Sequence, residues 1–306
     1  MSVYDIIIVG GGPAGLTAAI YARRNGKSVL LLEKEGFGGQ INYAPRVENY
    51  PGVGSVSGAE LAERMLDQVL SLDADTDIGT VCAVVDRGAT KLVRTEEGEE
   101  FEGRAVILAA GARHRHLGLP GEEELLGHGV SYCAVCDGGF YGGGTVAVAG
   151  GGDSALQEAL LLSDICKKVY VIHRRDSFRG DRDKQQRLFA RENVEVVTPA
   201  EISALVAADG DLTAVRVRRA GSPEEREIAV DALFISVGQV PELGAFADVL
   251  PLTRAGYADV DGECSSPVPG VFAAGDCRSK TVRQLTTAVG DGAVAALNAC
   301  RYLEST

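Results

Sequence analysis

The sequence predicts an α/β protein in which two domains each contain a parallel sheet flanked by helices. The main observation is that one pattern, a strand followed by a glycine-rich turn, a helix and another strand, occurs near the N-terminus and again near the middle of the chain. With 306 residues, of which 45% are hydrophobic, the chain is long enough to bury two cores. Strands alternating with helices in this order are typical of doubly wound parallel sheets.

The first copy of the pattern begins with the apolar run 4–9, which is typical of a buried parallel strand. A helix is expected over 16–24 and a second strand over 27–33. Glycines in the turn permit a tight bend and let the backbone approach a pyrophosphate at the helix N-terminus. The turn residues expected to bind a dinucleotide are Gly10, Gly12, Pro13, Ala14 and Gly15.

The second copy has the same order, with strands expected over 145–149 and 168–173 and a helix over 154–163. Its turn contains the expected nucleotide-binding residues Gly150, Gly152, Asp153 and Ser154. One glycine fingerprint alone is a weak signal, but two fingerprints in the correct strand and helix context are specific. Both domains are therefore predicted to be Rossmann-like and dinucleotide-binding.

The residue that ends the second strand of each copy indicates which nucleotide is bound. In the first copy this residue is Glu33, and an acid here accepts hydrogen bonds from ribose hydroxyls and repels a 2′-phosphate, which suits FAD or NAD. In the second copy it is His173, followed by Arg174 and Arg175. These cationic donors suit the 2′-phosphate of NADPH.

The surroundings of the second site are basic within an acidic chain. Residues 167–191 hold nine Lys or Arg and three Asp, a net charge of +6 in a chain of net charge −13. A solvated basic helix face would explain the cations at Arg182, Lys184, Arg187 and Arg191. It would not explain the cations at the end of the strand, so NADPH is the favoured interpretation.

The overall composition limits the partners and the location. An isoelectric point near 4.9 argues against nucleic acid or an anionic membrane as the main partner. No apolar run approaches the roughly 18–20 residues of a membrane span. The chain enters a predicted strand almost at once, so no signal peptide is expected. Seven cysteines, mostly in apolar segments, suggest a reduced protein in the cytoplasm.

A Cys-x-x-Cys pair, Cys133 and Cys136, lies between the two glycine turns. A structural zinc site would need four ligands, usually with a second closely spaced pair, and the remaining cysteines are single and scattered; no metal is expected. A redox-active pair is favoured, because the start of a helix lowers the pKa of a thiol. Asp137 follows directly and is a candidate to move a proton in dithiol–disulfide exchange, although it could also serve as a helix cap. Two nucleotide sites and a thiol pair together predict that electrons pass from one nucleotide, through the other, to a disulfide.

Motifs along essentially the whole chain resemble those of the low-molecular-weight thioredoxin reductases. They lie at 10–15, 38–41, 47–52, 133–138, 173–179 and 274–276. The resemblance implies an enzyme that binds FAD without a covalent bond, oxidises NADPH and reduces thioredoxin, and that forms a homodimer. Cys136 would face the flavin and Cys133 would attack the partner disulfide.

The resemblance also implies further cofactor-binding residues. Those near the flavin would be Gly39, Gln40, Asn49, Gly275, Asp276, Arg283, Gln284 and Leu285, with Asp276 at the ribityl chain and the last three at the start of the final helix. The NADPH site would include Arg179 besides His173, Arg174 and Arg175. Relatives that act as dithiol oxidases keep the cysteine pair but lose the NADPH cations, whereas this sequence has both.

The order of the motifs predicts a discontinuous FAD domain interrupted by the NADPH domain. The FAD domain is expected at 1–115 and 240–306, and the NADPH domain, which carries the cysteine pair, at 116–239. Two crossing strands, near 112–117 and 238–243, would form a hinge. Because the disulfide and the NADPH site share one domain and must meet the same flavin, the resemblance implies that this domain rotates.

The sequence departs from the thioredoxin reductase pattern beside the cysteine pair. His128 stands where many relatives have Arg, Gly139 replaces an aromatic residue and Gly142 replaces a basic one. These changes weaken the expected anchors for thioredoxin. Adaptation to the organism's own thioredoxin is the favoured explanation, and a thioredoxin-like or small-molecule disulfide is the alternative. A non-catalytic flavoprotein that senses redox state is a second class of function, against which Asp137 counts.

Overall fold

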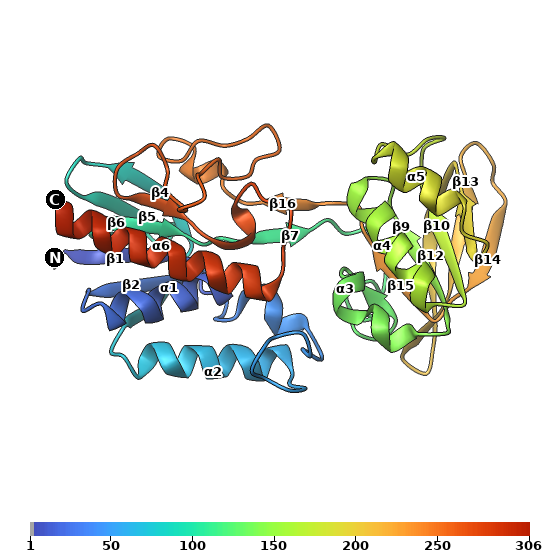
Figure 1. The fold of residues 1–306 in the computed structure, drawn as a ribbon, viewed down its shortest axis with the longest axis horizontal. Helices are drawn as coiled ribbons and strands as arrows, with labels where there is room; N and C mark the ends of the chain where they lie inside the picture. The colour runs from blue at the N-terminus through green and yellow to red at the C-terminus, as the bar shows by residue number, and fades with distance from the viewer. Residues whose placement is uncertain (1–2) are drawn as a thin grey trace. The chain divides into compact units, whose positions relative to one another are not determined.

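The computed structural model describes residues 3–306 of the chain, which form two compact units (Figure 1). Unit 1 runs to Arg113 and resumes at Val240, and unit 2 comprises His114–Gln239. In Figure 1 unit 1 therefore contains both ends of the colour scale, whereas unit 2 is green to orange. The boundaries expected from the sequence lay after 115 and after 239.

Unit 1 is a sheet with its three α-helices on one face. Its strands are β1 (Tyr4–Val9), β2 (Val29–Glu33), β3 (Asp75–Ile78), β4 (Val81–Asp86), β5 (Lys91–Thr95), β6 (Glu100–Leu108) and β17 (Val271–Ala273). Its helices are α1 (Pro13–Arg24), α2 (Gly58–Leu70) and α6 (Leu285–Ser305), with short 3-10 helices η1 (Gly39–Tyr43), η3 (Gly244–Phe246) and η4 (Gly275–Cys277).

Strands β3, β2, β1 and β6 are parallel neighbours, and β5 and β4 continue the sheet in antiparallel fashion. One edge of β6 is shared: its first half pairs with β5 and its second half with β17. This sharing joins the C-terminal part of the chain to the N-terminal sheet, because β17 arrives from beyond unit 2. The first glycine turn thus lies at the carboxyl edge of a sheet built from both chain ends.

Helices α1 and α6 cross at very short range on one face of this sheet. A Cβ at Gly292 of α6 would lie 2.1 Å from the carbonyl oxygen of Ala14 in α1. Both helices are rich in buried alanines, which leave the backbones close together. The opposite face of the sheet packs against η3 and the loop around 249–260.

Unit 2 contains the second copy of the pattern. Its strands are β8 (Val130–Ser131), β9 (Thr145–Ala149), β10 (Lys168–Ile172), β11 (Val194–Val197), β12 (Ala200–Ala208), β13 (Asp211–Arg219), β14 (Glu225–Ala229) and β15 (Ala232–Ile235). Its helices are α3 (Ala134–Asp137), α4 (Asp153–Ile165), α5 (Arg182–Phe189) and the 3-10 helix η2 (Gly138–Tyr141).

The main sheet of unit 2 is entirely parallel, in the order β11-β10-β9-β15-β8. The antiparallel sheet β12-β13-β14 covers one of its faces, and α4 with α3 covers the other. Parallel strands buried on both faces read as continuous apolar runs, which is the pattern of β9 and β15. The two parallel sheets confirm the predicted α/β class.

The chain passes between the units through two short strands, β7 (Ala112–His114) and β16 (Gln239–Pro241), which pair with each other. Among residues 3–306, no helix combines the length and apolar character needed to cross a membrane.

The crossing of α1 and α6 generates the first prediction. Gly292→Ala should lower the free energy of unfolding by about 1–3 kcal/mol, because the added methyl group must push the helices apart. Gly290→Ala on the same helix is the matched control, since a Cβ there would meet nothing within 4 Å. It should be neutral or stabilising. Denaturant unfolding measures both, and equal stability of the two variants would contradict the proposed close packing.

Candidate functional site

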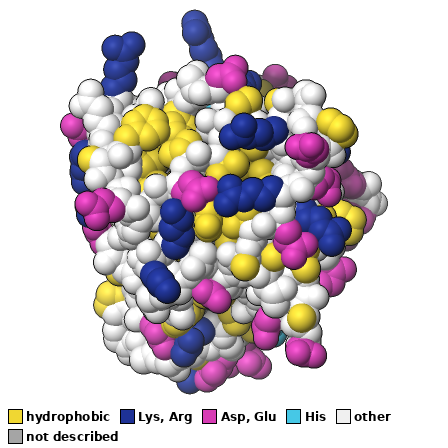
Figure 2. Space-filling model, turned by 90° about the vertical axis from the view of Figure 1, so that its right-hand side faces the viewer, with side chains coloured by type: hydrophobic (Ala, Val, Ile, Leu, Met, Phe, Trp, Pro, Cys, Tyr) yellow, Lys and Arg dark blue, Asp and Glu magenta, His cyan; other side chains and the backbone are white. Residues whose placement is uncertain are grey.

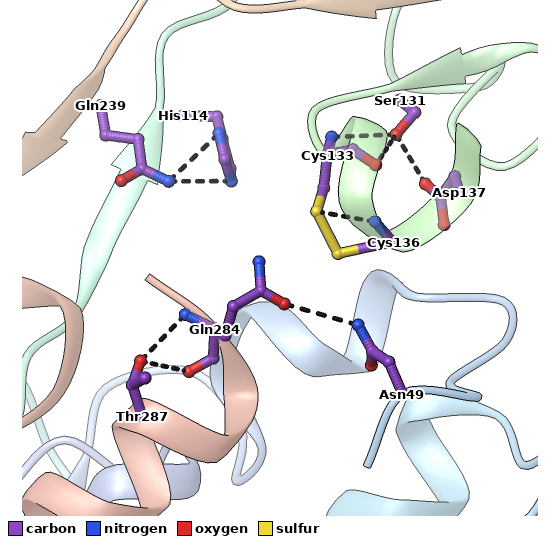
Figure 3. Close-up of a disulfide and its surroundings, with 9 residues drawn as sticks. All are labelled: Asn49, His114, Ser131, Cys133, Cys136, Asp137, Gln239, Gln284 and Thr287. Carbon is purple, nitrogen blue, oxygen red and sulfur yellow. Dashed lines mark hydrogen bonds between the residues drawn. A yellow bond between two sulfur atoms is a disulfide. The ribbon is translucent and has the colours of Figure 1, made fainter. Parts of the chain in front are cut away.

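Cys133 and Cys136 are joined by a disulfide at the start of α3, with their Cα atoms 5.3 Å apart (Figure 3). Cys133 is the N-cap residue of this short helix, and its Sγ accepts a hydrogen bond of 3.2 Å from the backbone N–H of Cys136. Cys136 is exposed and Cys133 is half-buried. The predicted placement of the pair at a helix start is confirmed.

Asp137 ends α3, one residue after the disulfide, and its carboxyl group is largely enclosed. Burial raises its pKa, and the hydroxyl of Ser131, which donates a hydrogen bond of 2.6 Å to Oδ2, partly opposes that rise. Ser131 Oγ also accepts a hydrogen bond of 3.0 Å from the backbone N–H of Cys133. A single hydroxyl therefore links the Asp137 carboxyl group to the loop that carries the disulfide.

Glu122, which was not predicted from the sequence, is a buried carboxylate that also binds the loop leading into the disulfide. Glu122 is only 3% exposed, and it accepts the phenolic hydrogen of Tyr132, the residue before Cys133, at 2.7 Å. Its two oxygens also accept hydrogen bonds from the backbone N–H groups of Leu117, Gly118 and Leu119. No local motif marks Glu122, because two similar acids follow it and only the fold distinguishes them.

The ring of Tyr132 continues this network towards the crossing strands. It stacks on His114 of β7 with ring centroids 4.8 Å apart. The amide nitrogen of Gln239 in β16 lies 3.3 Å from Nε2 of the same histidine (Figure 3). Burial lowers the pKa of His114 to about 4, so this ring is neutral at physiological pH. Both crossing strands thus contact the segment that leads into the disulfide.

The first glycine turn has the shape that a pyrophosphate requires. Side chains have no room at two of its glycines: a Cβ at Gly10 would lie 2.4 Å from Ala109 O, and one at Gly15 would lie 1.8 Å from Gly10 O. Gly12, in contrast, faces open space within 4 Å. Pro13 occupies the first turn of α1. The backbone is therefore open at the helix N-terminus, where an anion binds.

The other predicted flavin-side residues of unit 1 gather around this turn and the start of α6. The Glu33 carboxylate accepts a hydrogen bond of 2.6 Å from the Gly11 N–H, and Gly39 lies over Gly12, with its Cβ position 3.3 Å from Gly12 Cα. Gln40 lies in the same 3-10 helix, and its side chain is exposed.

Gln284 is the N-cap residue of α6 and forms a capping box with Thr287, and Leu285 is the first residue of the helix. The side-chain amide oxygen of Gln284 lies 3.4 Å from Asn49 Nδ2 (Figure 3). Arg283 stacks on the ring of Tyr257 at 4.2 Å and donates a hydrogen bond of 3.2 Å to the backbone carbonyl of Asp276.

Asp276 follows β17, directly after Gly275, whose φ of 83° lies in the left-handed region that favours glycine. Burial raises the pKa of its carboxyl group, although Lys280 lies 3.1 Å from Oδ1. This is an enclosed acceptor with unused capacity. It fits a polar ligand such as the hydroxylated chain of a flavin.

The second glycine turn repeats the geometry in unit 2. A Cβ at Gly150 would lie 2.3 Å from Ser236 O, whereas Gly152 faces open space. The Asp153 and Ser154 side chains, at the first turn of α4, are exposed. Asp153 accepts a hydrogen bond from the backbone of Asp181, which ties the following loop to the turn. This turn also fits a pyrophosphate.

His173 has a different role from the one expected. The ring is buried against Gly151, and burial, with the charges of Arg174, Arg175 and Arg179, lowers its pKa. This shift opposes protonation of His173 and so weakens its expected role as one of the cations. Its Nε2 atom is buried and has no hydrogen-bond partner among the described residues. The positive charge of the site comes from the three arginines around it.

Gly180 is a second residue that sequence reasoning missed. A Cβ at this position would lie 3.0 Å from the backbone of Gly152 and of Asp153, so only glycine lets the arginine-containing loop close over the turn. The Arg179 N–H donates to the carbonyl of Gly151 at 2.9 Å and holds the loop there. The signal was present in the sequence as a glycine directly after the basic motif.

The positions that depart from the thioredoxin reductase pattern are open to solvent. His128 lies 3.2 Å from the Asp211 carboxylate, and both side chains are exposed. A Cβ at Gly139 would meet nothing within 4 Å. Val135 and Phe140, on either side of Cys136 in the chain, are 60% and 41% exposed. The disulfide is thus flanked by apolar side chains that a protein partner could cover.

The predicted site residues fall into two sets. The first glycine turn and the flavin-side residues belong to unit 1, and the disulfide, Asp137, the second glycine turn and the arginines belong to unit 2. Within the described part of the chain, no group of three or more His, Cys, Asp or Glu side chains is arranged to hold a metal ion.

The sequence matches the family model described as pyridine nucleotide-disulphide oxidoreductase over residues 4–292. This chain belongs to that family. Membership makes it an oxidoreductase and implies a flavin and a pyridine nucleotide as cofactors.

Three relatives are more specific. A thioredoxin reductase of Listeria innocua is 41% identical over 302 residues, which cover 99% of this chain and 94% of that protein. A bifunctional thioredoxin reductase/thioredoxin of Mycobacterium leprae is 40% identical over 99% of this chain and 66% of its own length. The crystal structure of a thioredoxin reductase from Streptococcus pyogenes superposes with a TM-score of 0.95 at 40% identity, covering 99% of each chain. The resemblance inferred from the motifs is confirmed.

The buried carboxylate of Glu122 generates the second prediction. Glu122→Gln should lower the free energy of unfolding of unit 2 by about 1–3 kcal/mol, because the amide nitrogen it introduces faces hydrogen-bond donors. Glu124→Gln, an exposed neighbour in the same turn, should stay within about 0.5 kcal/mol of the parent. Denaturant unfolding followed by tyrosine fluorescence would test both. An unfolding curve for Glu122→Gln that coincides with the control would refute the role of this carboxylate.

Proposed function

We propose that this protein is a thioredoxin reductase that uses FAD and NADPH to reduce the disulfide of thioredoxin through Cys133 and Cys136. The observation that carries the proposal is that one folded unit holds both a disulfide with an adjacent buried carboxyl group, Asp137, and a glycine turn surrounded by arginines. The full-length similarity to thioredoxin reductases supports the same reaction.

The residues of unit 1 would hold FAD and those of unit 2 would hold NADPH. Gly12 and the N-terminus of α1 would receive the FAD pyrophosphate, Glu33 the adenosine ribose and Asp276 the ribityl chain. Gly152 would receive the NADPH pyrophosphate, and the arginines the 2′-phosphate. A flavin held by these unit 1 residues would supply two-electron redox chemistry between a nicotinamide and the disulfide.

The dithiol form of the pair would act by thiol–disulfide exchange. The Cys133 thiolate attacks one sulfur of the partner disulfide, so that a mixed disulfide forms and the other partner sulfur leaves as a thiolate, which takes a proton. Cys136 then attacks Cys133 Sγ, which restores the Cys133–Cys136 disulfide and releases the second partner thiolate. Asp137, with its raised pKa, is placed to carry the protons in these steps.

Thioredoxin is the partner that the comparisons favour. The Mycobacterium leprae relative is named as a reductase and a thioredoxin in one chain, so the two activities are linked in that protein. Exposed Val135 and Phe140 supply apolar contact area beside the disulfide. The comparisons give no support to a small-molecule disulfide as the main substrate.

Three further features rest on the resemblance and on the strand connections. Rotation of unit 2 about β7 and β16 would bring the disulfide and the nicotinamide to the flavin in turn. A homodimer is the assembly of the family that the motifs resemble. A cytoplasmic location agrees with free cysteines at 82, 166, 264, 277 and 300, of which four are buried.

Anaerobic reduction by NADPH of the purified protein tests the proposal. The flavin absorbance should bleach, and thioredoxin should then reoxidise it. Cys133→Ser and Cys136→Ser should each abolish thioredoxin reduction while leaving flavin reduction by NADPH intact. Cys82→Ser, an exposed cysteine outside the site, should retain full turnover. A protein that binds FAD and NADPH but never reduces a disulfide would be the redox sensor considered above.

The hydrogen bond between Ser131 and Asp137 generates the pH prediction. A general acid works in its protonated form, so the exchange rate falls as the pH rises through its pKa. The Ser131 hydroxyl lowers that pKa, and Ser131→Ala should therefore move the alkaline limb of the pH–rate profile to higher pH. Asp137→Asn should slow exchange by about 10²–10⁴-fold and remove the limb. If Asp137→Asn still shows the limb, another group is responsible for it.

A further inference from the structure

Four arginines of unit 2 that have no acidic partner lie near the carboxyl end of β10. Most Lys and Arg side chains of the described residues bind a carboxylate, a carbonyl or an amide oxygen. Those in unit 2 that have no ion pair or side-chain hydrogen bond in residues 3–306 include Arg174, Arg175, Arg179 and Arg219. The first three surround His173, whose pKa they lower. The chain has a net charge of −13, so acidic side chains are plentiful, yet these arginines have no acidic partner. Unpaired cations grouped in this way favour the binding of an anion.

Arg219 reaches this region through the strand register and not through the sequence motif. It ends β13, where it pairs with Ala200 at the start of β12. The Ala200 N–H in turn donates a hydrogen bond of 2.8 Å to the carbonyl of His173, and Ala220 N–H donates to Pro199 at 3.1 Å. The turn after β13 is therefore held at the carboxyl edge of the parallel sheet, directly beside the end of β10.

An open pocket of about 270 Å³ lies between these two segments. It is lined by Arg174, Ala200, Glu201, Arg218, Arg219, Ala220, Gly221, Ser222 and Pro223. Glu201 is the only acid of the lining, and it is already engaged by Arg218 at 2.6 Å. Arg174 and Arg219 keep their charge available. A pocket of this size suits a phosphate with part of its ribose, and it is too small for a whole dinucleotide.

Figure 2 views the end of the molecule that carries β10, β13 and β14, and it shows Lys and Arg side chains grouped over the upper and central part of this face. Acidic side chains are more frequent towards its lower edge.

We propose that Arg219 is a specificity-determining residue for the 2′-phosphate of NADPH, and that the turn after β13 forms a second wall of that site opposite Arg174. This inference rests on the proposed function. A phosphomonoester carries up to two negative charges at neutral pH, and the arginines that follow β10 approach the proposed site from one side only. Arg219 supplies a cation from the other side, and the Arg218–Glu201 ion pair holds the adjacent backbone in place.

The inference is tested by Arg219→Gln in the purified holoenzyme, with calorimetric titration of 2′,5′-ADP and of ADP, which lacks the 2′-phosphate. The affinity for 2′,5′-ADP should fall about tenfold, the loss expected for one charge-assisted hydrogen bond, whereas the affinity for ADP should not change. In steady state the KM for NADPH should rise by a similar factor, with kcat and the KM for NADH unchanged. Arg219→Lys should recover part of the affinity.

Arg216→Gln is the matched control, because Arg216 lies on the same strand, pairs with Glu227 at 3.2 Å and does not line the pocket. It should bind both nucleotides as the parent does. An unchanged 2′,5′-ADP affinity in Arg219→Gln would overturn the inference, and so would an equal loss for both nucleotides, which would indicate structural damage. Failure of the parent protein to bind 2′,5′-ADP would overturn the proposed NADPH specificity as well, so the two failures are distinguishable.

Discussion

The parallel sheet of unit 2 places the disulfide and the second glycine turn at one edge, and the rest of the site depends on this constraint. Strand β8 leads into the cysteine pair, β9 leads into Gly150, and β15 lies between them. The carboxyl ends of parallel strands meet at the same edge of a sheet. The close approach of Gly150 to Ser236, which follows β15, draws the outgoing crossing segment to the same place. Thiols, nucleotide turn and strand connection are thus parts of one rigid edge.

This arrangement explains why polar groups near the cysteines are buried and satisfied. Glu122 accepts hydrogen bonds from three backbone N–H groups and from the Tyr132 hydroxyl, and His116 Nδ1 lies 3.6 Å from its Oε1, so the buried carboxyl group is fully satisfied. Leaving any of these groups without a partner would cost about 1–3 kcal/mol. Asp137 is in the opposite condition, because burial exceeds the support of its one hydroxyl partner and its pKa rises. The same loop therefore contains one carboxyl group that stabilises structure and one that is ready to hold a proton.

The parts of this protein that the sequence predicted are those with local causes. The strands, the helices and the glycine turns follow from apolar runs and from backbone positions such as Gly10, which no side chain can occupy. The cysteine pair is recognisable from spacing alone. Glu122 and Arg219 could not be assigned in this way, because each acts on residues brought to it by the fold, whereas Gly180 left a signal as the glycine that follows the basic motif. His173 was expected to be one of the cations, and its burial against Gly151, which lowers its pKa, appears only in the fold.

The lowered pKa of His173 also changes how the basic region should be understood. A buried charge would need a partner, and three arginines around an imidazole make its protonation unfavourable. The ring therefore packs as an apolar wall between the glycine turn and the arginines, and its unpartnered Nε2 adds no charge. The cations are left on longer side chains that reach outward from the strand end, while their number on one side of a phosphate is limited by mutual repulsion. A cation such as Arg219, delivered from a different strand, escapes part of that repulsion because it approaches from another direction.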